Sequence, residues 1–149
     1  MTKNIAQPQF QTQKAWVVFC AHTDLPWLRF LKSGFRHCFI LLNDNQVWVS
    51  IDPLSTHTDI QIHHHLGGDY DLPRWLETQG FKVLSAEINT SHTRPAPWMA
   101  FTCVEAIKRT LGIHRRFIFT PWQLYKFLKN KNENENQKQN VKGKFLWAI

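Results

Sequence analysis

Short apolar runs bounded by turn residues divide most of this chain into predicted strands. Each run is rich in β-branched or aromatic residues, as strands in a compact domain usually are. The six predicted strands are residues 14–22, 35–42, 46–52, 58–65, 81–88 and 115–119. The second and third runs flank Asn43-Asp44-Asn45, so we predict a β-hairpin at this place.

Helix signals occur at four places between or after these runs. Thr102 and Glu105 form a Thr-x-x-Glu capping box, apolar residues follow at helical spacing, and Gly112 can close the helix. Thr120 and Gln123 form a second box of this kind. The predicted helices are residues 24–34, 72–79, 103–111 and a helix that begins at Pro121.

Composition separates the chain into three parts. Residues 1–13 are polar and are expected to form a flexible N-terminal arm, whereas residues 14–129 hold the predicted strands and helices. Residues 130–149 form a basic low-complexity tail: residues 130–144 are mostly Asn, Lys, Glu and Gln, which predicts disorder, and the last residues are apolar. We therefore predict one α+β domain with a central antiparallel β-sheet and packed helices.

Length and charge limit the classes of function. The chain has 149 residues, of which 43% are hydrophobic, so it can bury a core as a single domain. Its formal charge is +7, but five lysines against two glutamates in residues 129–144 account for +3 of it. The remaining charge is only modestly basic. Such a surface suits nucleic acid, a membrane or an acidic cell-wall polymer, but it is too weak a signal to predict specific nucleic-acid binding.

Cysteine usage and hydropathy predict a location. Cys20, Cys38 and Cys103 are widely spaced and odd in number, which fits a reducing compartment better than a disulfide framework. The N-terminus lacks the apolar run of a signal peptide, and no stretch approaches the ~18 apolar residues of a membrane helix. We expect a cytoplasmic protein without a membrane span, with a virion location or release by cell lysis left open.

Cys103 is the strongest candidate for chemistry. As the first residue of a capped helix it lies beside unpaired backbone N–H groups and a partial positive charge, which favour the nucleophilic thiolate. A thiolate of this kind needs a basic partner, usually histidine. Of eight histidines, His37 fits best, because it starts an apolar strand beside a turn.

The predicted hairpin suggests a third residue. If Asp44-Asn45 is a two-residue turn, Asp52 lies directly opposite His37, and Ser50 is a diagonal neighbour and the alternative third residue. A loop of three residues would instead bring Ile51 opposite the histidine. Asp52 is therefore the first candidate to orient His37, and its position depends on the register.

These residues resemble a known family. A strand that begins "FRHCFILL", followed later by "FTCVEAIKRTLGI", is similar to the circularly permuted branch of the NlpC/P60 papain-like superfamily, which includes bacterial and phage proteins and lecithin:retinol acyltransferase-like enzymes. The resemblance covers roughly residues 16–128. It implies a permuted papain-like fold in which Cys103 is the nucleophile of a thiol hydrolase or acyltransferase and His37 is its base.

The resemblance implies a substrate class as well. Cys103 would attack an amide, ester or thioester carbonyl, for example in a cell-wall peptide such as peptidoglycan or in a small acyl substrate, and no cofactor would be needed. Trp98, just before the cysteine, is a candidate for a substrate-binding groove. The three histidines at residues 63–65 lack the paired ligand spacing of a zinc site, so we predict no metal.

Two other classes of function stay open. The domain could be an inactive structural or accessory module, derived from a phage, whose C-terminal tail docks onto a protein partner. It could also bind nucleic acid through its basic face, which would require aromatic side chains within a basic groove. The sequence alone does not put aromatic residues in such a groove.

Overall fold

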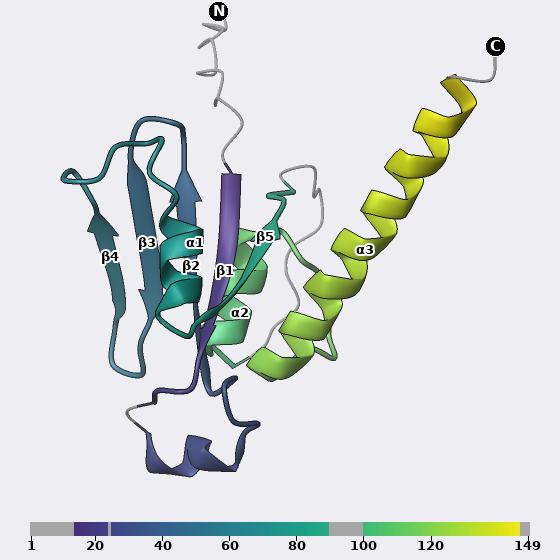
Figure 1. Cartoon of the computed structure of the whole chain (residues 1–149). Helices are drawn as coiled ribbons and strands as arrows, with labels where there is room; N and C mark the ends of the chain where they lie inside the picture. Colours follow the sequence, from purple (N-terminus) through teal and green to yellow (C-terminus); the bar gives the residue numbers. More distant parts are fainter. Residues whose placement is uncertain (1–13, 24, 90–99, 147–149) are drawn as a thin grey trace, which may run out of the picture.

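Five antiparallel strands form a single sheet with helices on both of its faces (Figure 1). The computed structural model describes residues 14–23, 25–89 and 100–146. The strands, in the spatial order β4-β3-β2-β1-β5, are β1 (Lys14–Cys20), β2 (His37–Asn43), β3 (Trp48–Pro53), β4 (Thr58–Ile62) and β5 (Lys82–Ala86). The predicted α+β class with a central antiparallel sheet is confirmed.

The helices are distributed unequally over the two faces. They are the 3-10 helix η1 (Pro26–Phe30) and the α-helices α1 (Leu72–Thr78), α2 (Cys103–Thr110) and α3 (Pro121–Leu146). In Figure 1, α1 covers the near face of the sheet and α2 lies behind it. η1 lies beyond the end of β1 and the start of β2, past the lower edge of the sheet in Figure 1.

Strand alternation produces two hydrophobic cores, because successive side chains of a strand point to opposite faces. Ala15, Val17 and Phe19 of β1 face α2 and α3, whereas Val18 faces α1. The larger core contains Ala15, Val17, Phe19, Cys38, Ile40, Val104, Ile107, Leu111, Leu124 and Leu128. The smaller core contains Val18, Leu41, Trp48, Leu72 and Leu76. Burial on both faces holds β1 and β2, the central strands, in a fixed register.

The β2–β3 turn is one place where the sequence prediction was wrong. Asn43 pairs with Trp48, so four residues, Asp44 to Val47, form the loop. The Asp44 carboxylate accepts hydrogen bonds from the backbone N–H groups of Gln46 and Val47, each at 2.9 Å. Asn45 adopts a left-handed conformation with φ of 71°. These local bonds stabilise a wider turn than the predicted pair Asp44-Asn45, and they move β3 by two residues along β2.

Two predicted elements of the chain differ in the structure. Residues 115–119 form turns between α2 and α3 and not a strand, and Phe117 is exposed. β4 and β5 form the two edges of the sheet, and residues 115–119 pair with neither of them. The predicted helix at residues 24–34 is reduced to η1, which buries none of its side chains and so lacks the packing that extends short helices.

α3 corrects the prediction that residues 130–144 are disordered. The helix begins at the predicted Thr120 cap and continues to Leu146. Lys131 forms ion pairs with Glu135 at 3.5 Å, one turn along the helix, and with Glu87 after β5 at 3.2 Å. The Asn132 side chain donates to the Ser85 carbonyl of β5 at 2.9 Å. Side-chain pairs at this spacing and the anchor on β5 favour a helix despite the low-complexity composition.

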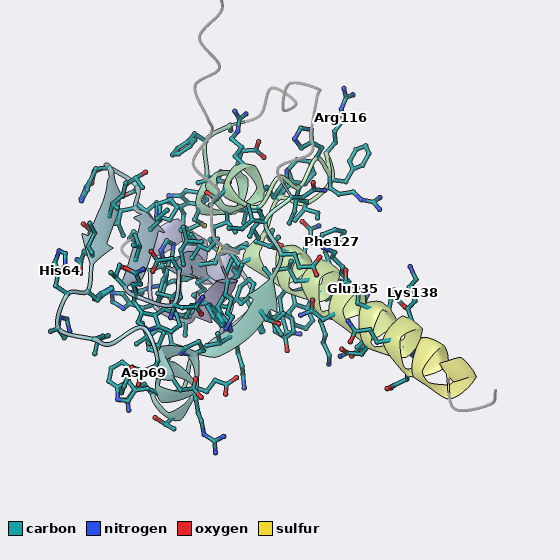
Figure 2. All side chains as sticks on the ribbon, turned by 90° about the horizontal axis from the view of Figure 1, so that it is seen from above. His64, Asp69, Arg116, Phe127, Glu135 and Lys138 are labelled. Carbon is teal, nitrogen blue, oxygen red and sulfur yellow. The ribbon has the colours of Figure 1, made fainter. Side chains whose placement is uncertain are left out.

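The far half of α3 extends beyond the sheet in both views (Figures 1 and 2). Glu135 and Lys138, labelled in Figure 2, lie along this half. The predicted N-terminal arm, residues 1–13, lies outside the described residues, as do Asp24, Trp98 and residues 147–149.

Candidate active site

His37, Asp52 and Cys103 line one cavity, where the start of β2, the end of β3 and the start of α2 come together. β2 begins at His37, β3 ends one residue after Asp52, and α2 begins at Cys103. Two strand ends and a helix start thus bring together residues that are up to 66 positions apart in the sequence. Backbone hydrogen bonding in the sheet fixes His37 and Asp52 relative to each other, and core packing fixes α2.

The start of α2 forms as the sequence predicts. The Thr102 hydroxyl accepts a hydrogen bond from the backbone N–H of Glu105 at 3.2 Å, which makes Cys103 the first helical residue. The Glu105 carboxylate accepts hydrogen bonds from Lys108 at 2.8 Å and Arg109 at 3.0 Å. Glu105 and Lys108 are both buried, so this pair ties the first turn of α2 to the next.

His37 and Asp52 are in direct contact. The distance from His37 Nε2 to Asp52 Oδ1 is 2.6 Å, and the side chains are 17% and 31% exposed. The residues are not directly opposite each other as predicted: Ile40 pairs with Ile51, so continuing the register brings Asp52 opposite Phe39. A shift of two residues keeps a side chain on the same face. The contact is therefore diagonal, over a span that these two side chains can bridge.

Ser50, the alternative third residue, has a different partner. It pairs with Leu41 across the sheet, and its hydroxyl lies 3.0 Å from Nε2 of His63. Asp52, the first candidate, therefore makes the contact with His37, and Ser50, the alternative, does not.

Two neighbours on β2, Cys38 and His37, act on the Cys103 sulfur. The hydrogen-bond donors that favour its thiolate are the Cys38 thiol, the His37 ring and the Cys38 backbone N–H. Together with the charge of His37, these bonds outweigh burial and lower the pKa of Cys103 to about 5, with the Cys38 thiol as the largest cause. A pKa of about 5 favours the thiolate form of Cys103 at neutral pH.

His37 is the matching cation. Burial alone would lower the pKa of His37, but the hydrogen bonds with Asp52 and Cys103 and the charges of both groups raise it to about 9. Because Nε2 faces Asp52, Nδ1 is the ring nitrogen left for the sulfur. Between about pH 5 and pH 9 the pair is thiolate and imidazolium, as in activated cysteine nucleophiles.

The two other cysteines lie in the same region, and their pKa values are raised instead of lowered. Cys20 ends β1 and pairs with His37 across the strands. Burial raises the pKa of Cys20 to about 11, and burial also raises the pKa of Cys38 well above that of a free thiol. The three cysteines are free thiols, and only Cys103 has a lowered pKa.

A cavity of about 800 Å³ opens beside these residues, and Cys103, His37, Asp52 and Cys20 lie in its wall. Most of the remaining wall is apolar and includes Leu28, Leu31, Phe39, Leu54 and Phe81. Trp27 and Phe101 also line the cavity although they are 64% and 68% exposed, so aromatic side chains reach from the cavity to solvent. The size and the apolar lining are those of a site for a small organic ligand.

Sequence reasoning missed Cys38 and Cys20 as parts of the site. Strict alternation puts Cys38 on the face of β2 opposite to His37, which argues against a shared contact. Cys38 acts on Cys103 because α2 begins beside the start of β2, and Cys20 belongs to the cavity wall. Cys20 could be assigned only from the β1–β2 register, which the sequence does not specify. Trp98 lies in the part of the chain that the structure does not describe.

The histidine run at residues 63–65 stays outside the site. The rings of His63 and His65 are 5.8 Å apart, and His63 contacts Ser50. Among residues 14–23, 25–89 and 100–146, no group of three or more His, Cys, Asp or Glu side chains has the arrangement of a metal site.

No protein-family model, curated protein or solved structure matches this chain. No helix within the described ranges is both long enough and apolar enough to cross a membrane. Function must therefore be inferred from the contacts of Cys103, His37 and Asp52 and from the cavity that they line.

Proposed function

We propose that this chain is a cysteine hydrolase or acyltransferase that acts on an amide or ester bond, with Cys103 as nucleophile, His37 as general acid and base, and Asp52 as the residue that orients His37. The observation that carries the proposal is that Cys103 lines one cavity together with the contacting pair His37 and Asp52, and that His37 lowers the pKa of Cys103. The permuted papain-like resemblance of the sequence independently implies the same roles for Cys103 and His37. A buried structural cysteine would need neither the imidazole partner nor the cavity.

The first half of the reaction forms an acyl-enzyme. The Cys103 thiolate attacks the carbonyl carbon of the substrate, and a carbon–sulfur bond forms while the carbonyl electrons move to oxygen. The backbone N–H of Cys103, at the start of α2, is suited to stabilise that oxyanion. When the intermediate collapses, the carbon–nitrogen or carbon–oxygen bond breaks and the leaving group takes a proton from His37, leaving a thioester on Cys103.

The second half releases the acyl group. Neutral His37 takes a proton from water, or from an alcohol or amine acceptor, as that molecule attacks the thioester. Collapse of this intermediate returns the electron pair to sulfur and regenerates the thiolate and imidazolium pair. Asp52 holds the ring through Nε2 in both halves, so that Nδ1 stays directed at the sulfur.

The cavity wall favours an apolar acyl group. Leu28, Leu31 and Phe81 offer few hydrogen-bonding groups to a polar glycan or peptide, whereas an alkyl or aromatic acyl chain would bury its surface against them. We therefore favour a small acyl ester or amide as the substrate over a cell-wall peptide. With either substrate, the far half of α3 is open to a partner protein.

Hydrolysis of p-nitrophenyl esters with acyl chains of two to twelve carbons tests the proposal. We expect a burst of p-nitrophenol, an acyl adduct on Cys103 by mass spectrometry, and loss of both in Cys103→Ser. His37→Ala should lower the rate about 10²-fold or more, because the general acid and base are lost. Cys20→Ser, in the same cavity, is the matched control and should retain activity. A folded protein without burst or adduct would favour the inactive accessory module.

A second surface favours binding of an anionic polymer as a second candidate function. A shallow pocket of about 470 Å³ is lined by Arg115, Arg116, Lys126 and Phe127 among others. The Arg115 guanidinium lies 5.7 Å from the Phe127 ring centroid, so a basic groove does contain an aromatic side chain. Binding of single-stranded RNA that weakens steeply with salt, and is lost in Arg115→Gln/Arg116→Gln but not in Lys138→Gln, would support it.

A further inference from the structure

Arg36 stands out in the cavity wall. It is the only lysine or arginine among the described residues that line the cavity, and it directly precedes His37. Its backbone N–H donates to the Cys20 carbonyl at 2.9 Å, which holds this residue at the end of the β1–β2 pair. The backbone of Arg36 is therefore held next to His37, and Arg36 contributes to a cavity lining that is otherwise mostly apolar.

The Arg36 side chain lacks a partner that its surroundings would normally supply. Its Nε atom is buried and has no hydrogen-bond partner in the part of the chain that the structure describes. Asp52, the acidic residue of the cavity, contacts His37 instead. Buried polar groups in native proteins are nearly always satisfied, so an arginine of a cavity wall with an unsatisfied donor is a candidate to pair with an anionic group of a ligand.

We propose that Arg36 binds an anionic oxygen group, a carboxylate or a phosphate, that the substrate carries near the bond attacked by Cys103. The inference rests on the proposed function and narrows it to substrates that combine an apolar acyl group with a negative charge. A guanidinium suits this role, because its planar donors match carboxylate and phosphate oxygens and its charge acts strongly in an apolar wall. Arg36 is then a residue that determines specificity, distinct from the residues that react.

Two alkylating probes of similar size test this without knowledge of the substrate. Iodoacetamide is neutral and iodoacetate carries a carboxylate, and both alkylate Cys103 with loss of iodide. The rate ratio, iodoacetate over iodoacetamide, is measured at Cys103 by mass spectrometry at pH 7 and low salt, and is divided by the same ratio for glutathione. We expect the normalised ratio to exceed one and to fall about tenfold in Arg36→Gln.

Matched variants separate recognition from general electrostatics. Arg36→Lys keeps the charge and should keep most of the ratio, and Arg116→Gln, outside the cavity, should leave it unchanged. The proposal is overturned if Arg36→Gln retains the ratio, or if both probes slow equally, since Arg36 would then act on the thiolate. Arg36→Lys keeps the test valid if Arg36→Gln fails to fold. Slow iodoacetamide labelling of the wild-type Cys103 would instead count against the proposed nucleophile.

Protection experiments distinguish the two anions. Octanoate, octyl phosphate and octanol share an alkyl chain and differ in the head group, and each is added before iodoacetamide. We expect one or both anions to protect Cys103 at a concentration at least about tenfold below that of octanol, with the advantage lost in Arg36→Gln. The better anion identifies carboxylate or phosphate as the group bound. Equal protection by octanol would refute anion recognition.

Discussion

Cys103 and Cys20 line the same cavity, yet their surroundings give the two thiols opposite character. Cys103 begins a helix and accepts hydrogen bonds from Cys38 and His37, and its pKa is lowered to about 5. Cys20 ends a strand, its thiol donates weakly to the His22 carbonyl at 3.7 Å, and burial raises its pKa to about 11. Both residues are cysteines of one cavity wall, so the difference in pKa comes from the hydrogen-bond donors around each sulfur.

The comparison separates burial from activation. Burial disfavours the thiolate at both positions. At Cys103 three donors and a neighbouring positive charge reverse that effect, whereas the Cys20 thiol only donates a hydrogen bond to a carbonyl oxygen. A cysteine in a cavity is therefore a nucleophile only where the fold directs donors at the sulfur, and each donor can be removed in turn.

The largest predicted difference is in the reactivity of the two thiols with pH. At pH 6 Cys103 is mostly thiolate and Cys20 almost wholly thiol. We expect iodoacetamide to label Cys103 at least about 10²-fold faster, after allowing for the lower intrinsic nucleophilicity of a low-pKa thiolate. Labelling of Cys103 should rise through about pH 5, and labelling of Cys20 only towards pH 11. Site-resolved mass spectrometry measures both profiles.

A matched pair of variants checks this assignment. Cys103→Ser should remove the fast phase of labelling, and Cys20→Ser should leave it intact. If the two thiols of the folded protein label at the same rate at pH 6, the contrast between them does not exist in solution.

A smaller effect is expected from the Cys38 thiol, the largest cause of the lowered pKa of Cys103. Cys38→Ala removes this donor, so the pKa of Cys103 should rise and its labelling profile should move up by about one pH unit. Cys38→Ser keeps a donor and should keep the profile near its wild-type position. Because Cys38 is fully buried, urea unfolding of both variants is needed to verify the fold. A profile that does not move in Cys38→Ala would exclude the thiol as a donor.

The smallest effect is expected from Asp52. Its carboxylate stabilises protonated His37, so Asp52→Asn should lower the pKa of His37 from about 9. The pH range in which Cys103 is thiolate and His37 is imidazolium should then end at a lower pH. NMR titration of the His37 ring measures this directly. Labelling of Cys103 at pH 7 should fall only about threefold, because the ring still contacts the sulfur. Ser50→Ala, on the same strand, is the control that should change neither value.

Hydrophobic periodicity predicted much of the fold correctly, because it reports local burial. The five strands and the start of each long helix follow from runs such as residues 14–20 and from the caps at Thr102 and Thr120. Residues 115–119 were wrongly predicted as a strand, since a β-prone run forms a strand only where it pairs with a neighbouring strand, and this run does not. The prediction of disorder after residue 130 was also wrong, because Lys131 and Asn132 anchor α3 on the β5 region.

The sequence by itself determined that Cys103 begins a helix and that His37 lies at the start of a strand, because helix caps and apolar strand runs act over a few residues. The tertiary structure alone decided that the three meet, that Cys38 donates to Cys103 while Cys20 does not, and that Arg36 faces the cavity without a partner. Those contacts depend on strand register and on the packing of α2 against the sheet, and both are set by burial across the whole domain and not by neighbours in the chain.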